Sequence, residues 1–372
     1  MAAARLHGPS IRRRFASRAG VLLAMAAAHP FSLLVTLVLL YAAWIVGERI
    51  VSWGIIHATF IADDRSGCNP GGACWAFVVN RLPQFLFGFY PEAERWRALA
   101  AVLAPPALML LAVAPEFRGR RLVVAAGFSL YPLLAFALLA GGLPGLPAVS
   151  TERWGGLTLT MLVGMSAFVL SFPLAILLAL ARTSSLPALR LVAAGFIEFW
   201  RGLPLVAILF MSVIMLPLFL PPGVEAPRLS LALAGITFYS AAYLAEVVRG
   251  GLQGIGRGQY EAAGALGFGF WSMQGYVVLP QALRSVVPAI VNAAIALFKD
   301  TTYVMVVGLF DLLNIVVAGL SDANWIGLAA EGYVFVGVIY WTICFGMSRM
   351  SARFEHGAQG ARPAGAAAGA GR

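Results

Sequence analysis

The residues best able to do chemistry in this chain are a few charged side chains set within apolar stretches. They are Glu198 and Arg201, Glu246 and Arg249, and Lys299 beside Asp300. An isolated charge at the centre of a bilayer costs about 2.5–3.5 kcal/mol on insertion scales, so such residues are seldom kept without a role. A zwitterionic cargo needs both signs of charge, because its ammonium group pairs with a carboxylate and its carboxylate pairs with a cation.

Two interpretations of these charges stay open. The first two pairs are spaced i,i+3, so each can pair locally and anchor a helix end near the membrane interface. Alternatively, they line a polar path for cargo. Lys299 and Asp300 point apart on a helix, so each needs its own partner, either a substrate or a contact that fixes the interface with a second membrane subunit. Pro204 can break its helix because its ring removes a backbone donor. The possible substrate path therefore comprises Glu198, Arg201, Pro204, Lys299, Asp300 and Thr301.

Catalytic and nucleotide-binding motifs are not evident in the sequence. The four histidines, His7, His29, His57 and His356, are scattered and form neither a triad nor a metal cluster. The single lysine, Lys299, is not preceded by the GxxxxGK pattern that a phosphate-binding loop requires. We expect no catalytic residues, no metal and no cofactor bound by this chain, so its energy must come from a partner ATPase or an ion gradient.

Cys68 and Cys74 bracket a short Asn-Pro-Gly-Gly-Ala turn. Two cysteines make a poor zinc site, which prefers four ligands. In an oxidising compartment a disulfide is favoured over two free thiols. Cys344 lies within an apolar stretch and is expected to serve packing.

A polar interval of roughly 35 residues, about 249–285, interrupts the apolar sequence. It contains Glu261-Ala-Ala-Gly-Ala-Leu-Gly267 and, further on, Leu279-Pro280. Good helix formers predict a short helix over 259–266, and Gly267 suits a left-handed C-terminal cap. A second short helix is predicted over 270–279, ended by Pro280. Such a helix–glycine–helix unit offers a projecting surface to which a partner can bind.

Composition places the chain in a membrane, since 60% of its residues are hydrophobic and only 11% are charged. The fold class predicted is an all-α polytopic membrane protein with about eight transmembrane helices. The predicted spans are 31–46, 96–114, 122–140, 157–181, 191–220, 229–248, 286–310 and 333–350.

Arginines orient these spans. If they alternate, the N-terminal cluster from Arg5 to Arg18, the group around Arg120 and the polar interval all fall on one side, which the positive-inside rule makes the cytoplasm. Both termini are then cytoplasmic. The exceptions on the opposite side are Arg49, Arg65, Arg81, Arg95, Arg97, Arg153 and Arg228. Because the basic residues follow membrane faces, the net charge of +10 implies no nucleic-acid partner.

The two ends of the chain differ in composition from the predicted spans. Residues 20–28 after Arg12-Arg-Arg14 can be a short signal peptide, but the apolar run resumes at Phe31, which favours an interfacial helix leading into an uncleaved span. The tail from Gly357 is rich in Ala, Gly and Pro and is expected to be disordered.

The motif Glu261-Ala-Ala with Gly267 and Leu279-Pro280 resembles the EAA loop of ABC-importer permeases. Three further stretches strengthen the resemblance to the polar amino-acid branch: Phe199-Trp-Arg-Gly-Leu-Pro204, Ala242 to Gly250, and Leu297-Phe-Lys-Asp-Thr301. With its long N-terminal extension, the whole chain resembles the AapM-type permeases of general L-amino-acid importers. One departure is Gln274-Gly-Tyr276, where the family often carries basic residues.

This resemblance implies a five-helix type I importer core and an inner-membrane location. It also implies two ATPase subunits that use ATP, a second related permease, and a periplasmic amino-acid-binding protein. The EAA-loop residues expected to dock the ATPase are Glu261, Ala262, Ala263, Gly267, Leu279 and Pro280. The domains predicted are 1–30, a basic cytoplasmic N-terminus; 31–150, three extra spans with a periplasmic loop; 151–353, the core, with the EAA loop at 249–285; and 354–372, a disordered cytoplasmic tail.

Two alternatives belong to other classes. An ion-coupled secondary transporter of small zwitterionic solutes needs coupling residues at mid-bilayer, which Lys299 and Asp300 could supply. A purely structural membrane scaffold leaves the polar loop without a purpose. Because this loop resembles the EAA loop, it favours the ATP-driven importer over both alternatives.

Overall fold

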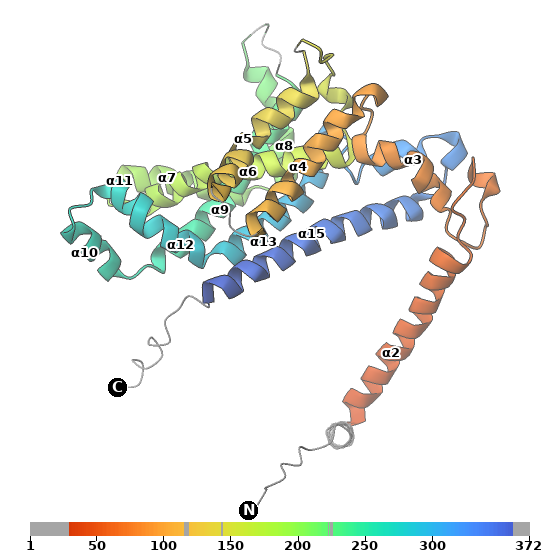
Figure 1. The fold of residues 1–372 in the computed structure, drawn as a ribbon, viewed down its shortest axis with the longest axis horizontal. Helices are drawn as coiled ribbons and strands as arrows, with labels where there is room; N and C mark the ends of the chain where they lie inside the picture. Colours follow the sequence, from red (N-terminus) through yellow and green to blue (C-terminus); the bar gives the residue numbers. More distant parts are fainter. Residues whose placement is uncertain (1–29, 115–118, 143, 222, 224–225, 360–372) are drawn as a thin grey trace, which may run out of the picture. The chain divides into compact units, whose positions relative to one another are not determined.

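A computed structural model describes residues 30–114, 119–142, 144–221, 223 and 226–359 (Figure 1). Within these ranges the protein is helical, and its only β-type pairings are isolated bridges. This confirms the predicted all-α class. The predicted N-terminal interfacial helix and most of the predicted tail lie outside the described residues. The last helix, α15 (Ala329–Gln359), includes residues 354–359 of the tail that was expected to be disordered, because Glu, Ala and Gln there extend a helix readily.

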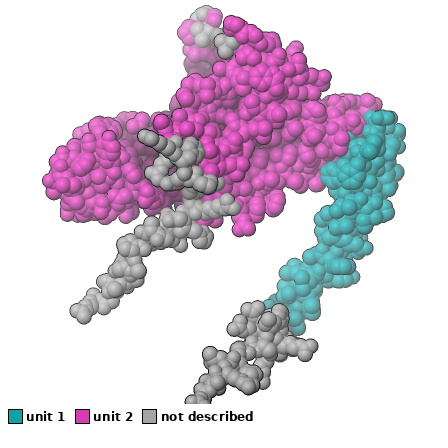
Figure 2. Space-filling model, in the orientation of Figure 1, with its two compact units in different colours: residues 1–76 teal, residues 77–372 magenta. Residues whose placement is uncertain are grey.

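The chain divides into two compact units, residues 1–76 and 77–372 (Figure 2). In the first unit, α2 (Pro30–Val51) continues through a π-helical turn to Ile56, making one span of 26 residues. The first span therefore extends to Ile56, ten residues beyond its predicted end at residue 46. A loop closes after it, with the Trp53 and Trp75 rings 6.1 Å apart.

The second unit begins within α3 (Trp75–Phe87). It continues with α4 (Arg95–Val113), α5 (Arg120–Ala140), α6 (Gly156–Arg182), α7 (Pro187–Gly202), α8 (Leu205–Phe210), α9 (Arg228–Gln253), α10 (Arg257–Ala265), α11 (Phe270–Met273), α12 (Leu279–Ser285), α13 (Val287–Asp300), α14 (Ile315–Leu320) and α15. The α6 and α9 helices pack together most extensively.

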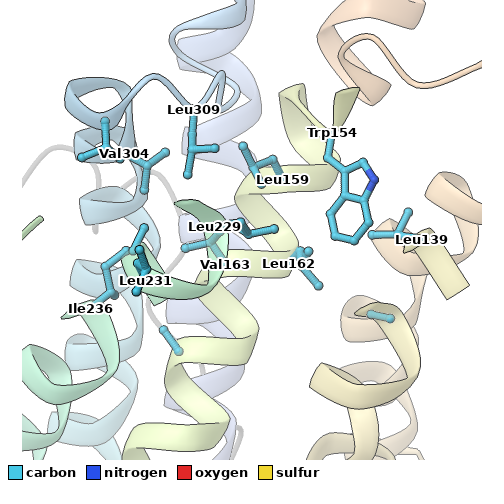
Figure 3. Packing of buried hydrophobic residues seen from close by; sticks show 14 of the residues in the cluster. Leu139, Trp154, Leu159, Leu162, Val163, Leu229, Leu231, Ile236, Val304 and Leu309 are labelled. Atoms are coloured by element: carbon cyan, nitrogen blue, oxygen red, sulfur yellow. The ribbon is translucent and has the colours of Figure 1, made fainter. Parts of the chain in front are cut away.

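The largest hydrophobic core lies where α6 and α9 meet their neighbours. Figure 3 shows Leu159, Leu162 and Val163 of α6 beside Leu229 and Leu231 of α9, with other buried residues around them. These long apolar helices bury one stripe against each other and leave the remaining surface apolar, as expected in lipid. The core therefore fixes the positions of α6 and α9, whose ends carry the candidate site.

Two glycines join the end of α3 to the start of α6. Gly88 and Gly156 both have φ near +60°. A Cβ at Gly156 would collide with the carbonyl oxygen of Phe85, so the two segments approach more closely than any side chain allows. Local backbone chemistry thus sets where α6 begins.

The number of spans agrees with the prediction once one bent helix pair is counted. Among the described residues, seven helices are long and apolar enough to cross a membrane, or eight if the bent pair is a single span. That pair is α7 with the segment Leu205–Phe219, bent by 103°. The predicted fifth span is therefore not one helix. The break falls at Pro204, as predicted, because proline lacks the donor that would continue the helix.

Several arginines that violate the predicted charge rule are neutralised locally. Arg95 pairs with Glu92, Arg97 with Glu94, and Arg81 with Asp322. Arg97 is fully buried, and its guanidinium donates to the carbonyl oxygens of Leu138, Leu139 and Pro147 at 2.6–3.1 Å. These hydrogen bonds therefore join α4 to the end of α5.

Candidate functional site

The polar loop folds as a compact helical hairpin. The first helix, α10, ends in a Schellman motif: the Phe268 amide donates to the Ala263 carbonyl at 3.1 Å, and the Gly267 amide to that of Gly264 at 3.0 Å. Gly267 has φ +80°, the left-handed conformation expected for it. The short helix and its glycine cap agree with the prediction to within about two residues.

The predicted end of the second helix is wrong. Helical structure runs from Phe270 through a π-helical turn (Gln274–Val278) into α12, and Pro280 lies in the first turn of α12. Proline is tolerated there because first-turn amides have no intrahelical acceptor. Pro280 therefore begins a helix instead of stopping one.

The hairpin packs on the ends of α6 and α9. Val278 and Ala282 are fully buried against Ala179, Val248 and their neighbours. A Cβ at Gly251 would lie 2.7 Å from the Ala282 carbonyl oxygen, so α9 and α12 touch backbone to backbone. The hairpin is thus rigidly seated on the two most extensively packed helices.

The opposite surface of the hairpin is exposed and strongly apolar. Glu261 and Ala262 are exposed, whereas Ala263 is buried. Four large side chains of the hairpin are also more than half exposed: Leu266 at 77%, Phe270 at 54%, Trp271 at 70% and Tyr276 at 80%. Sequence reasoning missed these four, although aromatic residues inside a polar interval were a usable signal. The Phe270 and Trp271 rings contact each other with centroids 5.1 Å apart, and exposed aromatic residues of this kind are typical of interaction surfaces.

A charged cluster lies where α6, α7 and α9 meet. Glu246 accepts from Arg249 at 2.6 Å and lies 3.4 Å from Arg182 and 3.9 Å from Arg201. The predicted local pair of Glu246 and Arg249 is confirmed. The predicted pair of Glu198 and Arg201 is wrong, because Glu198 pairs with Arg182 at 3.0 Å. Helix crossing, not spacing along one helix, decides these partners.

Lys299, Asp300 and Thr301 stand at the end of α13, where the helix tightens into a 3-10 turn (Thr301–Val307). Lys299 is exposed, Asp300 is half-buried, and Thr301 is buried with its hydroxyl donating to the Phe298 carbonyl. Within the described part of the chain, Lys299 and Asp300 have no ion-pair partner closer than 4 Å. They do not join the cluster around Glu246.

Asp311, which sequence reasoning passed over, is completely buried just after this turn. Its carboxylate accepts from the amides of Leu313 and Asn314, the Asn314 side chain, and the Tyr340 hydroxyl at 3.2 Å. Burial raises the pKa of Asp311 from 3.8 to about 6, although these donors oppose the rise. Nothing in its local sequence distinguishes it from a solvated loop acid.

In the first unit, Cys68 and Cys74 form a disulfide with their Cα atoms 5.6 Å apart. Cys344 is a free thiol in α15. No group of three or more potential metal ligands occurs in the residues that the structure describes.

This chain is similar to a known protein family and to several known proteins. Residues 171–359 match the family described as "Binding-protein-dependent transport system inner membrane component". The chain is 44% identical over 328 residues to the inner membrane amino-acid ABC transporter permease protein YhdY of Escherichia coli, covering 87% of this chain and 88% of the relative. The chain belongs to this family of inner membrane components.

The chain is also similar to two further proteins. It is 38% identical over 386 residues to the glutamate/glutamine/aspartate/asparagine transport system permease protein BztC of Rhodobacter capsulatus, covering 87% of this chain and 88% of that protein. A crystal structure of an amino acid ABC transporter with histidines aligns at 29% identity and a TM-score of 0.46, covering 53% of this chain and 89% of that chain. As a family member, this inner membrane component is a multi-pass permease and not itself an enzyme.

Proposed function

We propose that this permease carries L-amino acids inward across the inner membrane as part of an ATP-driven importer. The observation that supports the substrate class is the similarity over nearly the whole length to permeases named for amino acids. ATP would be hydrolysed by a partner ATPase, because the chain lacks a phosphate-binding GxxxxGK loop. A second related permease and a periplasmic amino-acid-binding protein would complete the importer, and both termini would be cytoplasmic.

The hairpin from α10 to α12 is proposed as the ATPase-docking element. Its inner side is seated on α6 and α9, so a push on it is passed directly to membrane-spanning helices. Its exposed residues include the charged Glu261 and the large apolar side chains of Leu266, Phe270 and Trp271. Interfaces concentrate their energy in such aromatic anchors.

The docking proposal is tested with Glu261→Lys and Gly267→Asp, measured by co-purification of the ATPase and by amino-acid uptake. Both variants should lose ATPase association and uptake. Glu92→Lys is the matched control: Glu92 is also exposed but lies outside the hairpin, before α4, and should leave both unchanged. Normal association by the hairpin variants would remove the docking role.

The energy source separates the importer from an ion-coupled transporter. Uptake into cells should stop when ATP is depleted and persist when an uncoupler collapses the ion gradient while ATP is maintained. The opposite pattern would overturn the proposed ATP coupling and favour ion-coupled transport, in which Lys299 and Asp300 would carry the coupling charge.

A further inference from the structure

A partly open cavity of about 550 Å³ lies between α4, α5, α6, α13 and α15. Its lining is aliphatic, aromatic and methionine-rich, and only Thr342 and Ser351 among the described lining residues carry polar side chains. The Thr342 hydroxyl is already used, since it donates to the Val338 carbonyl at 2.8 Å. The cavity therefore offers almost no polar group to a water-soluble ligand.

The cavity exists because small residues and prolines face one another across it. Pro105 and Pro106 lie inside α4, while Gly164, Ala294 and Gly346 contribute little side chain from α6, α13 and α15. α4 packs on α5 and α6, while α13 packs on both α6 and α15. The space that these five helices surround is left unfilled by the protein.

Such a space does not stay empty in a bilayer. Apolar cavities exclude water, and an unfilled void forfeits the dispersion contacts of its lining. Each of the five surrounding helices belongs to a candidate membrane span. The apolar molecule available at the highest concentration around those helices is the hydrocarbon chain of a lipid.

A cation lies beside the cavity lining in the sequence of α15. Arg349 follows Gly346 by one helical turn on α15 and directly precedes Met350, which lines the cavity. Its guanidinium is held over the Phe345 ring, 5.4 Å from the centroid. An arginine held in this way is well suited to bind a phosphate. We propose that the cavity binds one acyl chain of a membrane phospholipid, with the lipid phosphate at Arg349.

The experiment uses the full chain in vesicles of phosphatidylethanolamine and phosphatidylglycerol containing phosphatidylethanolamine with a diazirine midway along one acyl chain. After irradiation, labelled residues are mapped by mass spectrometry. Met165 and Phe298 should be labelled, because both line the cavity and Phe298 is only 6% exposed, out of reach of surrounding lipid. Labelling confined to exposed residues outside the cavity, such as Leu133 or Leu134 of α5, would overturn the proposal.

Gly346→Leu provides the decisive variant. A Cβ at Gly346 meets no atom within 4 Å, so the new side chain enters the cavity without displacing the protein, and labelling of Phe298 should be lost. Gly337→Leu on the same helix is the control: it also meets nothing within 4 Å but does not line the cavity, so its labelling should match that of the unaltered protein. Equal labelling in both variants would contradict the proposal.

Three further variants complete the test. If Gly346→Leu does not fold, Ala294→Leu enters the cavity from α13 and should abolish the same labelling. If another protein helix fills the cavity, Gly346→Cys will be cross-linked to protein by a bifunctional thiol-reactive reagent and Phe298 will stay unlabelled, which overturns lipid binding. Arg349→Gln should lower the amount of co-purified phospholipid seen by native mass spectrometry, and unchanged retention would refute the phosphate contact.

Discussion

At the level of single residues, several charged side chains of this permease pair with side chains from other helices. Glu246 is contacted by Arg182, Arg201 and Arg249, which come from three different helices. Arg201 additionally lies over the Tyr243 ring at 5.2 Å. Charge pairs of this kind hold helix ends together, so the cluster fixes how α6, α7 and α9 meet.

Asp311 should make the stability of the protein depend on pH. Its pKa in the folded protein, about 6, exceeds the ordinary value of 3.8, so the folded state binds the proton more tightly than the unfolded state. The resulting stabilisation, about 3 kcal/mol at most, is complete below pH ~4 and is lost as pH rises through about 6. The thermal midpoint in detergent should therefore rise between pH 7.5 and pH 5, by more in the unaltered protein than in Asp311→Asn.

The comparison between the two proteins isolates this carboxyl from other acids. The amide that Asp311→Asn introduces retains an oxygen that can accept from the Asn314 backbone N–H, so the variant should still fold. A midpoint that shifts equally with pH in both proteins would show that Asp311 is already ionised when buried.

Lys299 and Asp300 should matter for assembly or for transport, because neither has an ion-pair partner within the described chain. Lys299→Met and Asp300→Asn each remove one charge with little change in volume. Loss of the permease pair on purification would indicate that the charges contact the second permease. Intact assembly with a raised substrate requirement would indicate contact with cargo. If both variants assemble and transport normally, these charges lie in water at the membrane edge.

At the level of elements, the hairpin from α10 to α12 is built so that one glycine sets the angle between its helices. The Schellman motif at Gly267 ends α10 and redirects the chain into α11, while Gln281 donates to Gln259 across the hairpin at 3.1 Å. The π-helical turn before α12 then lets the chain pass Pro280 without a break. The orientation of the exposed aromatics depends on this geometry.

Gly267→Ala should weaken ATPase association without altering any side-chain contact. No atom lies within 4 Å of a Cβ at this position, so the effect comes only from holding an L-residue at φ +80°, which costs about 1–2 kcal/mol. Gly264→Ala is the matched control, since this glycine lies inside α10 with equally open surroundings and should gain about 1 kcal/mol of helix propensity. Association and uptake are measured for both, and equal association would contradict a role for the glycine cap.

At the level of the whole molecule, the orientation in the membrane rests on an imperfect charge rule. Three of the exceptions, Arg81, Arg95 and Arg97, are paired with acids in the folded protein. The remaining bias still favours cytoplasmic termini. With that orientation, the predicted order of spans before α6 puts the disulfide loop outside.

The disulfide offers a direct test of that orientation. In intact spheroplasts, a membrane-impermeant thiol reagent should label Cys68 and Cys74 only after reduction, because oxidised cysteines do not react. The double variant Cys68→Ser with Cys74→Ser should abolish the labelling. The remaining cysteine, Cys344, lies within a candidate membrane span that the reagent does not reach. Labelling that appears only in inverted vesicles would reverse the topology, and labelling before reduction would show that the bridge is absent.

The sequence by itself determined the features that depend on short stretches of chain. Apolar length predicts spans, Gly267 predicts a left-handed cap, and Pro204 predicts a helix break, because each follows from backbone chemistry within a few residues. The tertiary structure decided which residues meet. Glu198 binds Arg182 rather than its sequence neighbour, and Asp311 is buried although its local sequence looks like a loop. Partners and burial depend on how helices distant in sequence cross, and periodicity along one helix contains no information about that crossing.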